Sequence, residues 1–211
     1  VPLAALTAIR GLRGALRDLT HDCDKALGRR RVLINGASGG VGTFAVQLAR
    51  IFGAEVTAVC SARNLELTRE LGADHTLDYT EEDFTRRAGL YDVVFDVVGN
   101  KNFLACRGTL RDGGIYVTTE PGPRGFLWQA LTLPGENRKA RVVLVKTSGR
   151  DLSLLGDLLG TGRIRVVLDR VYPLEEAAEA HAYGEAGHSR GKVSLRMTGE
   201  PRSFERCSRW S

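Results

Sequence analysis

The fold of this chain is decided by the stretch Arg31-Val32-Leu33-Ile34-Asn35-Gly36-Ala37-Ser38-Gly39-Gly40-Val41-Gly42. It begins as a short apolar segment typical of a buried strand and ends as a glycine-rich loop. Residues 41–52 continue with apolar side chains at helical spacing, and Gly53 follows as a C-terminal cap. A strand, a glycine loop and a helix in this order form the phosphate-binding unit of dinucleotide folds.

The glycines of the loop would let the backbone approach a pyrophosphate, and the helix that follows would direct unpaired N–H groups at it. Gly39 and Gly42 take the second and third glycine positions of the G-x-G-x-x-G pattern, whereas Ala37 replaces the first. Gly40 widens the turn, and Ser38 offers a hydroxyl to a phosphate oxygen. The alternative is a turn that only lets helix and strand pack closely; the strand before it and the helix after it favour dinucleotide binding.

Apolar strand-like segments alternate with helical ones along most of the chain. We expect strands at residues 31–35, 55–60, 75–79, 91–98, 115–119 and 141–145, and helices at residues 2–19, 41–52, 64–71, 81–87, 103–110 and 152–159. Strands that are apolar nearly throughout and alternate with helices indicate a parallel sheet covered on both faces. Right-handed crossovers then give a doubly wound α/β fold of the Rossmann type. A further strand at 164–168, a helix at 174–186 and a strand at 192–197 follow.

The end of the second strand decides between NADH and NADPH, because an acidic residue there binds the ribose 2′-hydroxyl and repels a 2′-phosphate. This chain has Cys60-Ser61-Ala62-Arg63 at that point and no carboxylate. Ser61 can donate a hydrogen bond and Arg63 supplies positive charge to a phosphate. Arg63 could also be an exposed cation at a helix start, but the pattern favours the phosphate role and NADPH.

Composition narrows the class of protein. Hydrophobic residues make up 43% and the net charge is +5, with one basic cluster at Arg29-Arg30-Arg31. We interpret that cluster as a solvated turn before the strand and expect no nucleic-acid binding. No apolar run approaches the ~20 residues that a membrane span needs, so no membrane role is expected. The apolar start, Val1 to Leu6, lacks a basic region and a Met, and we interpret it as the start of a truncated segment rather than a signal peptide.

The four cysteines, Cys23, Cys60, Cys106 and Cys207, form no C-x-x-C pair and have no histidine at zinc-site spacing. Reduced thiols in a cytoplasmic protein are the interpretation that this pattern favours. It predicts no metal site.

At this point the sequence resembles a known family. The string from Val32 to Ala49 is similar to the nucleotide-binding core of the zinc-independent quinone oxidoreductases, the zeta-crystallin-like branch of the medium-chain dehydrogenase/reductase superfamily. Further matching pieces are Leu71-Gly72-Ala73-Asp74-His75, Asp78-Tyr79, Phe95-Asp96-Val97-Val98-Gly99 and Gly191-Lys192-Val193. The resemblance covers residues 2–197.

The resemblance implies NADPH-dependent reduction of a quinone or an enone. It also assigns site residues to cofactor groups. The glycine loop, Ser38, Gly39, Gly40, Val41 and Gly42, would meet the pyrophosphate; Ser61, Arg63 and Tyr79 would surround the 2′-phosphate; Val98 and Thr119 would approach the ribose and nicotinamide; and Lys192 would lie near the cleft. Relatives pair the last strand of this domain across a two-fold axis, which implies a homodimer through Arg141 to Val145.

The chain departs from the family in one respect: members begin with a GroES-like substrate domain that is almost wholly absent here. We therefore divide the chain into a dinucleotide-binding domain (1–160), a C-terminal segment of the substrate domain (161–198) and a polar tail (199–211) expected to be disordered. Most substrate contacts would be missing, as would the part in which zinc-dependent relatives place their ligands. A non-catalytic NADPH-binding module, or a fragment that keeps only cofactor binding, is the alternative.

A second alternative is the short-chain dehydrogenase pattern, which the loop also fits through Gly36, Gly40 and Gly42. Those enzymes need a Tyr and a Lys one helical turn apart, yet Tyr183 is followed four residues later by Gly187. No other tyrosine has a Lys at that spacing, which argues against this chemistry. We name no catalytic residue, because in the resembled family the cofactor supplies the hydride and the protein supplies orientation.

Overall fold

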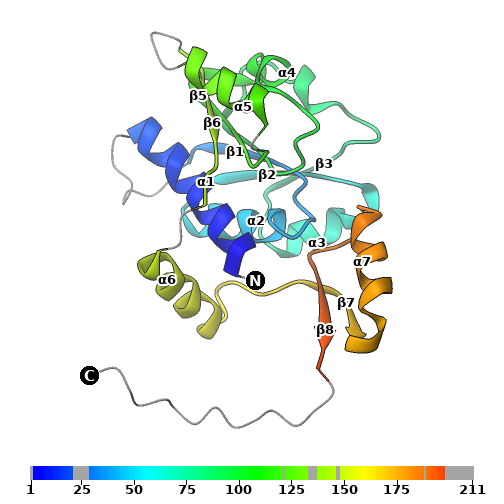
Figure 1. Cartoon of the computed structure of the whole chain (residues 1–211). Helices are drawn as coiled ribbons and strands as arrows, with labels where there is room; N and C mark the ends of the chain where they lie inside the picture. Colours follow the sequence, from blue (N-terminus) through cyan, green and yellow to red (C-terminus); the bar gives the residue numbers. More distant parts are fainter. Residues whose placement is uncertain are drawn as a thin grey trace, which may run out of the picture.

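The computed structural model of the chain describes residues 2–20, 29–120, 122–132, 137–145, 148–187 and 189–197. Its centre is a six-stranded sheet with the order β3-β2-β1-β4-β5-β6 (Figure 1), in which all paired strands are parallel. The strands are β1 (Arg31–Asn35), β2 (Glu55–Cys60), β3 (His75–Asp78), β4 (Tyr91–Asp96), β5 (Leu110–Thr118) and β6 (Lys139–Val142). The chain runs outward from β1 to one edge and then from β4 to the other, so the predicted doubly wound fold is confirmed.

Helices cover both faces of this sheet (Figure 1). One face carries α1 (Pro2–Thr20), α2 (Gly42–Ile51), α3 (Leu65–Glu70) and α6 (Gly149–Gly160). The other carries α4 (Phe103–Arg107), α5 (Pro123–Leu131) and a 3-10 turn, η2 (Phe84–Arg86). Along β1, Val32 and Ile34 enter the first core and Leu33 enters the second. This alternation explains why the strand is apolar throughout.

The first helix packs directly on the sheet. Ala5, Ile9 and Leu12 of α1 are fully buried, as their helical spacing predicts. A Cβ atom at Gly11 would lie 2.5 Å from Cζ of Phe95 on β4. The missing side chain at Gly11 therefore lets α1 approach the ring of Phe95 closely.

A second, two-stranded parallel sheet follows, formed by β7 (Leu168–Pro173) and β8 (Lys192–Arg196). Between them lie the 3-10 turn η3 (Leu174–Glu176) and α7 (Ala177–Glu185), where a helix was predicted. Leu168, Val171, Leu195 and Met197 are exposed on or beside these strands. The boundaries of the three predicted segments stay predictions, and the tail 199–211 lies outside the described residues.

The strand predicted at 164–168 is wrong, because β7 begins only at Leu168. In the part of this segment that precedes β7, the backbone of Arg165 bonds to the side chain of Gln47 on α2, and the Val167 carbonyl accepts from the Lys192 N–H of β8 (2.8 Å). The Gln47 amide donates to the Arg165 carbonyl (3.1 Å) and accepts from the Arg165 N–H (2.7 Å). Ile164 is buried in the core, which accounts for the apolar pattern.

The helix predicted at 81–87 is also wrong; only the 3-10 turn η2 forms there. Asp83 accepts hydrogen bonds from the N–H and the hydroxyl of Thr85, which favours a tight turn over a helix. Arg87 closes the segment with a two-point ion pair to Glu82 (2.6 and 2.8 Å). Phe84 alone is buried.

Two strands of the second half differ from their predicted bounds. β5 begins at Leu110 rather than residue 115, since its pairing with β4 continues through an irregularity between Tyr91 and Val93. The β5 stretch contains Gly113 at φ 80°, a signal that hid the strand in the sequence. β6 spans Lys139–Val142 rather than 141–145.

Helix α5 was not predicted, because Gly122 and Pro123 look like loop residues. Pro123 occupies the first turn of the helix, a position where proline is favoured. Two polar side chains of α5 and its end bond to β6: Thr132 accepts from the Ala140 N–H (2.9 Å) and Gln129 accepts from the Val142 N–H (2.7 Å). These contacts satisfy donors of β6 that β5 does not use.

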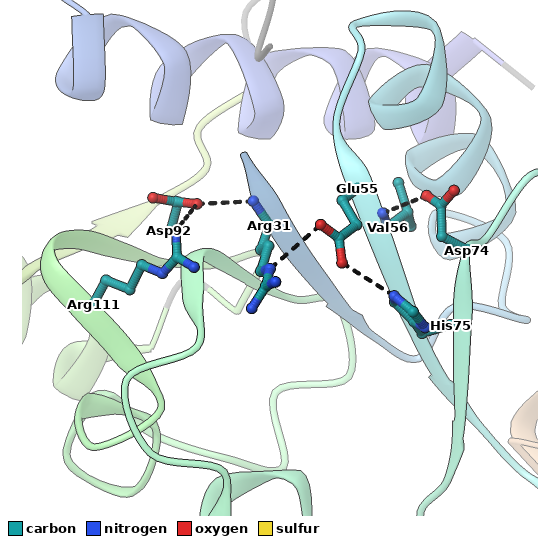
Figure 2. Close-up of polar contacts among 7 residues, drawn as sticks. All are labelled: Arg31, Glu55, Val56, Asp74, His75, Asp92 and Arg111. Carbon is teal, nitrogen blue, oxygen red and sulfur yellow. Dashed lines mark hydrogen bonds and ion pairs between the residues drawn. The ribbon is translucent and has the colours of Figure 1, made fainter. Parts of the chain in front are cut away.

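Carboxylates hold the amino ends of the strands (Figure 2). Asp92 accepts from the Arg31 N–H and Asp74 accepts from the Val56 N–H, each at 2.8 Å. Glu55 bonds to the Arg31 guanidinium at 3.3 Å. These contacts fix the register of β1 and β2 at the amino-terminal ends of the strands, on the opposite side of the sheet from the glycine loop.

Among the helices that the structure describes, none has the length and apolar character of a membrane span.

Candidate cofactor site

The glycine loop leaves β1 in a tight turn. Gly36 has φ +81°, a conformation that favours glycine. The N–H groups of Gly36 and Ala37 both donate to the Val59 carbonyl (3.1 and 3.0 Å), and the Gly39 N–H donates to the Gly36 carbonyl (3.1 Å). The loop is therefore held by its own backbone against β2.

Gly42 lies beneath this loop, at the start of α2. A Cβ atom there would lie 2.1 Å from the Gly36 oxygen and 2.7 Å from Cα of Ala37. The absence of a side chain at Gly42 lets α2 pack closely against the loop, which is the role that the motif assigns to its third glycine. Because α2 begins here, its unpaired N–H groups lie at the loop.

A cavity of about 540 Å³ opens above the loop, at the carboxyl ends of β1 and β2. This is the crevice in which ligands bind in open parallel sheets. Nine predicted residues line it: Ser38, Gly39, Gly40, Val41, Ser61, Arg63, Tyr79, Val98 and Lys192. Gly42 and Thr119 are not among the lining residues; the Thr119 N–H instead donates to the Asp96 carbonyl (3.2 Å).

One end of the cavity holds the three residues to which the sequence analysis assigned the 2′-phosphate. Ser61 and Arg63 follow β2, and Tyr79 follows β3 with its N–H bonded to the Cys60 carbonyl (3.2 Å). Asp78 ends the neighbouring strand, but its Oδ1 accepts from the N–H and the hydroxyl of Thr80. That carboxylate oxygen of Asp78 is therefore used in the turn that follows β3.

Sequence reasoning missed Asn64, which lies in the wall of the same cavity with only 4% of its surface exposed. Its amide nitrogen donates to the hydroxyl oxygens of Ser38 and Ser61, each at 3.1 Å. Both serines accept this bond, so their own hydroxyl protons remain for an acceptor in the cavity. The amide oxygen of Asn64 is buried with no partner among the described residues. A buried acceptor without a donor fits a site that a polar ligand completes.

The loop after β4 forms the opposite wall. Asp96 is fully buried, and its Oδ1 accepts from the N–H groups of Val98 (3.1 Å) and Gly99 (3.0 Å). Tyr116 donates its hydroxyl proton to Oδ2 of Asp96 (3.0 Å). Burial, with the charge of Asp96, raises the pKa of Tyr116 well above its usual range, so the phenol stays a donor. These bonds fix the position of Val98 over the cavity.

The C-terminal segment closes over the glycine loop. The Gly191 N–H donates to the Ser38 carbonyl at 2.8 Å. A Cβ atom at Gly40 would lie 2.4 Å from Nζ of Lys192, so the ammonium group rests against the loop. Burial lowers the pKa of Lys192 below its ordinary value. A partly desolvated cation next to a glycine loop is suited to an anionic phosphate.

Lys192 makes the expected affinity for NADPH depend on pH. A bound phosphate stabilises the charged lysine, so the affinity is full below the pKa of Lys192 in the free protein and falls as pH rises through it. Since burial lowers that pKa, we expect the fall to begin below the range of an exposed lysine. Calorimetric titrations across alkaline pH measure it. Lys192→Gln should remove this dependence and Lys139→Gln on β6 should retain it; identical profiles for wild type and Lys192→Gln would contradict the assignment.

The described thiols are not suited to nucleophilic chemistry. Cys60 lines the cavity, and burial raises its pKa. Burial also raises the pKa of Cys106 to about 12. Both side chains therefore stay protonated at neutral pH. Within the described residues, no group of three or more His, Cys, Asp or Glu side chains is placed to hold a metal ion.

Comparison with known proteins follows this geometry. Residues 71–195 match the family described as zinc-binding dehydrogenase. The chain is 34% identical to a chloroplastic quinone oxidoreductase of Triphysaria versicolor over 92% of this chain and 59% of that protein. It is also 34% identical to an NADPH-dependent alkenal/one oxidoreductase of Arabidopsis thaliana, over 92% of this chain and 45% of the relative.

A solved structure agrees with these relatives. The quinone oxidoreductase of Coxiella burnetii superimposes with a TM-score of 0.77 and 31% identity, covering 93% of this chain and 59% of its own. The chain thus spans about three fifths or less of the proteins it matches. It belongs to the zinc-binding dehydrogenase family, which is part of the medium-chain dehydrogenase/reductase superfamily.

Proposed function

We propose that the chain binds NADPH and that, together with an upstream substrate domain, it reduces a quinone or an enone. The observation that carries the proposal is the cavity above the glycine loop, where Lys192, Arg63 and two serine hydroxyls surround space for a phosphorylated ligand. The names of the relatives support the choice of chemistry, since they include quinone oxidoreductases and an NADPH-dependent alkenal/one oxidoreductase.

The residues of the chain bind and orient in this proposal. Lys192 and the loop hold the pyrophosphate, Arg63 and Ser61 hold the 2′-phosphate, and Val98 supplies an apolar wall. The cofactor, when bound, supplies a hydride to the acceptor, and a proton from solvent completes the two-electron reduction to a hydroquinone or a saturated ketone. No protein nucleophile is required.

The alternative function is a non-catalytic NADPH-binding module. The exposed apolar residues of the β7–β8 sheet favour it for this chain alone, because nothing described covers Val171 or Leu195 on that sheet. The two functions differ in turnover. Loss of NADPH in the presence of a quinone tests the proposed reductase, and binding without any oxidation would support the module.

Arg63 should determine the preference for NADPH over NADH. We expect Arg63→Ala to weaken NADPH binding by ~1–3 kcal/mol, the scale of a charge-assisted hydrogen bond, and to leave NADH binding nearly unchanged. Isothermal titration of both cofactors measures the difference. Arg69→Ala is the matched control, because Arg69 lies on α3 and bonds to Glu66 and Thr76 outside the cavity. Equal affinity of the wild type for NADH and NADPH would reject the preference.

We also propose a homodimer that extends the sheet. Of the predicted pairing segment, Arg141 to Val145, residues 143–145 lie beyond the end of β6 and would make the contact. The N–H groups of Ala140 and Val142 are already bonded to α5 and its end, whereas Leu144 is 59% exposed. Light scattering should give twice the chain mass, and Leu144→Glu should reduce it to a monomer because a carboxylate would be buried at the pairing. A monomeric wild type at high concentration would refute the dimer.

A further inference from the structure

Asn64 stands where an asparagine ordinarily caps a helix, yet it does not cap α3. It directly precedes the first residue of that helix, and its side chain makes no capping hydrogen bond. The amide is instead buried in the wall of the cavity above the glycine loop. There its nitrogen lies 3.1 Å from the hydroxyl oxygen of Ser38 and 3.1 Å from that of Ser61. The side chain therefore bonds to the two serines at the expense of the helix cap.

The orientation of the Asn64 amide leaves both serine protons available. Its NH2 group donates one N–H to each serine oxygen, so each hydroxyl accepts one bond and keeps its own proton to donate. The opposite orientation would use both serine protons on the amide oxygen. It would also leave two buried N–H donors without acceptors, in place of the one unpaired oxygen observed. The amide thus makes hydrogen-bond donors of both hydroxyls.

The two serines come from different elements, and one nitrogen atom brings them together. Ser38 lies in the glycine loop after β1, whereas Ser61 follows β2. The Asn64 N–H closes the turn after β2 by donating to the Ser61 carbonyl (2.9 Å), and Arg63 within this turn lines the same cavity. Two hydroxyls that bond to the same nitrogen are close enough to donate to the oxygens of a single phosphate group.

We propose that Asn64 is a positioning residue that joins Ser38, Ser61 and Arg63 into one subsite for a phosphate monoester, the 2′-phosphate of the cofactor. This inference rests on the proposed function. It moves the hydroxyl of Ser38 from the pyrophosphate, which NADH and NADPH share, to the phosphate that only NADPH carries. A phosphate monoester has about two negative charges and three acceptor oxygens at neutral pH, and two hydroxyls with a guanidinium suit it.

Ser38→Ala separates the two possible partners of that hydroxyl. In calorimetric titrations of the full chain, we expect it to weaken NADPH binding roughly 10-fold, the effect of one hydrogen bond to a charged group, and to leave NADH binding unchanged. Equal weakening of both cofactors would place the hydroxyl at the pyrophosphate and overturn the inference. Ser194→Ala is the matched control, because Ser194 lies on β8 and does not line the cavity.

Asn64→Asp keeps the shape of the side chain and reverses its hydrogen bonding. A carboxylate only accepts, so it would take both serine protons and set a negative charge against the phosphate. We expect NADPH binding to weaken by at least ~100-fold and the preference to turn to NADH, as an acidic residue after the second strand favours. Urea denaturation checks that the variant folds.

Asn64→Ala removes the donor without adding charge and should weaken NADPH binding roughly 10-fold. Adding Ser38→Ala to this variant should cost little more, because the hydroxyl has already lost its orientation. A purely structural role of Asn64 would instead weaken NADH and NADPH alike. An unchanged ratio of the two affinities in both Asn64 variants overturns the inference.

Two nucleotide fragments distinguish failure of this inference from failure of the proposed function. Adenosine 2′-monophosphate carries the monoester alone, and it should bind the wild type more tightly than it binds Asn64→Ala. Adenosine 5′-monophosphate carries its phosphate on the pyrophosphate side and should bind both proteins alike. The reverse pattern overturns the inference while NADPH binding stands. A wild type that binds neither dinucleotide would reject the proposed function and this inference with it.

Discussion

Replacing Gly42 with alanine is expected to abolish NADPH binding and to lower the free energy of unfolding by about 3 kcal/mol, the upper end of the cost of overpacking. The added Cβ would lie 2.1 Å from the Gly36 oxygen and 2.8 Å from the carbonyl carbon of Ala37. These are backbone atoms, so no side-chain rotation relieves the clash. Either α2 or the loop must move, and both moves displace the N–H groups that would bind the pyrophosphate.

Gly39→Ala is the matched control in the same loop. Its Cβ would lie 3.4 Å from the Gly36 oxygen, an ordinary contact, and the position has no positive φ. We therefore expect near-native unfolding in urea for this variant. Calorimetry and urea denaturation of both variants test the expectation. Gly42→Ala with wild-type NADPH affinity would show that the loop is not the cofactor site.

Joining an upstream substrate domain to this chain is expected to raise kcat/KM for quinone reduction by at least ~100-fold, since positioning and exclusion of water supply much of the rate of hydride transfer. The chain contributes the cavity above the glycine loop, which is the proposed cofactor site. Its β7–β8 sheet leaves Val171 and Leu195 exposed where further strands would pack. An acceptor held at the proposed cofactor cavity would thus still be open to water in the short chain.

The comparison needs steady-state kinetics of NADPH oxidation with the short and the extended chain at equal cofactor saturation. The affinity for NADPH should be alike in both, because the residues lining its cavity lie in this chain. The extended chain with Gly42→Ala serves as the control for background reduction. Comparable kcat/KM for the short and extended chains would mean that the described residues already form the whole active site.

The parallel sheet was predictable from sequence because burial on both faces makes β1, β2 and β4 apolar over most of their length. Segments whose backbone groups bond to side chains rather than to another strand were not predictable in this way. The apolar segment after residue 163 has a strand pattern, yet Gln47 takes both of its Arg165 hydrogen bonds. That pairing joins residues far apart in sequence, and local periodicity carries no sign of it.

The candidate site divides in the same way. Ser38, Ser61 and Arg63 were predictable because motif position fixes them relative to strand ends. Asn64 was not, because an asparagine before a helix reads as a cap or turn residue. Its contacts to the two serines become visible only when the loop and β2 are side by side. Thr119 was assigned to the site from the family resemblance, but it does not line the cavity, and its N–H donates to the Asp96 carbonyl instead.

The hydrogen bond from the Gly191 N–H to the Ser38 carbonyl joins the C-terminal part of the chain to the glycine loop, so it can form only late during synthesis on the ribosome. The glycine loop emerges long before Gly191 does, and at roughly 5–20 residues per second the interval is on the order of ten seconds. Throughout that interval Lys192 does not yet exist, so the nascent sheet presents an unclamped loop. Ligand cannot assist the early steps of folding at full affinity. Because β8 supplies Lys192 and follows Gly191, the cleft is complete only after β8 has been synthesised. Full-affinity binding of the cofactor therefore requires that synthesis has passed β8.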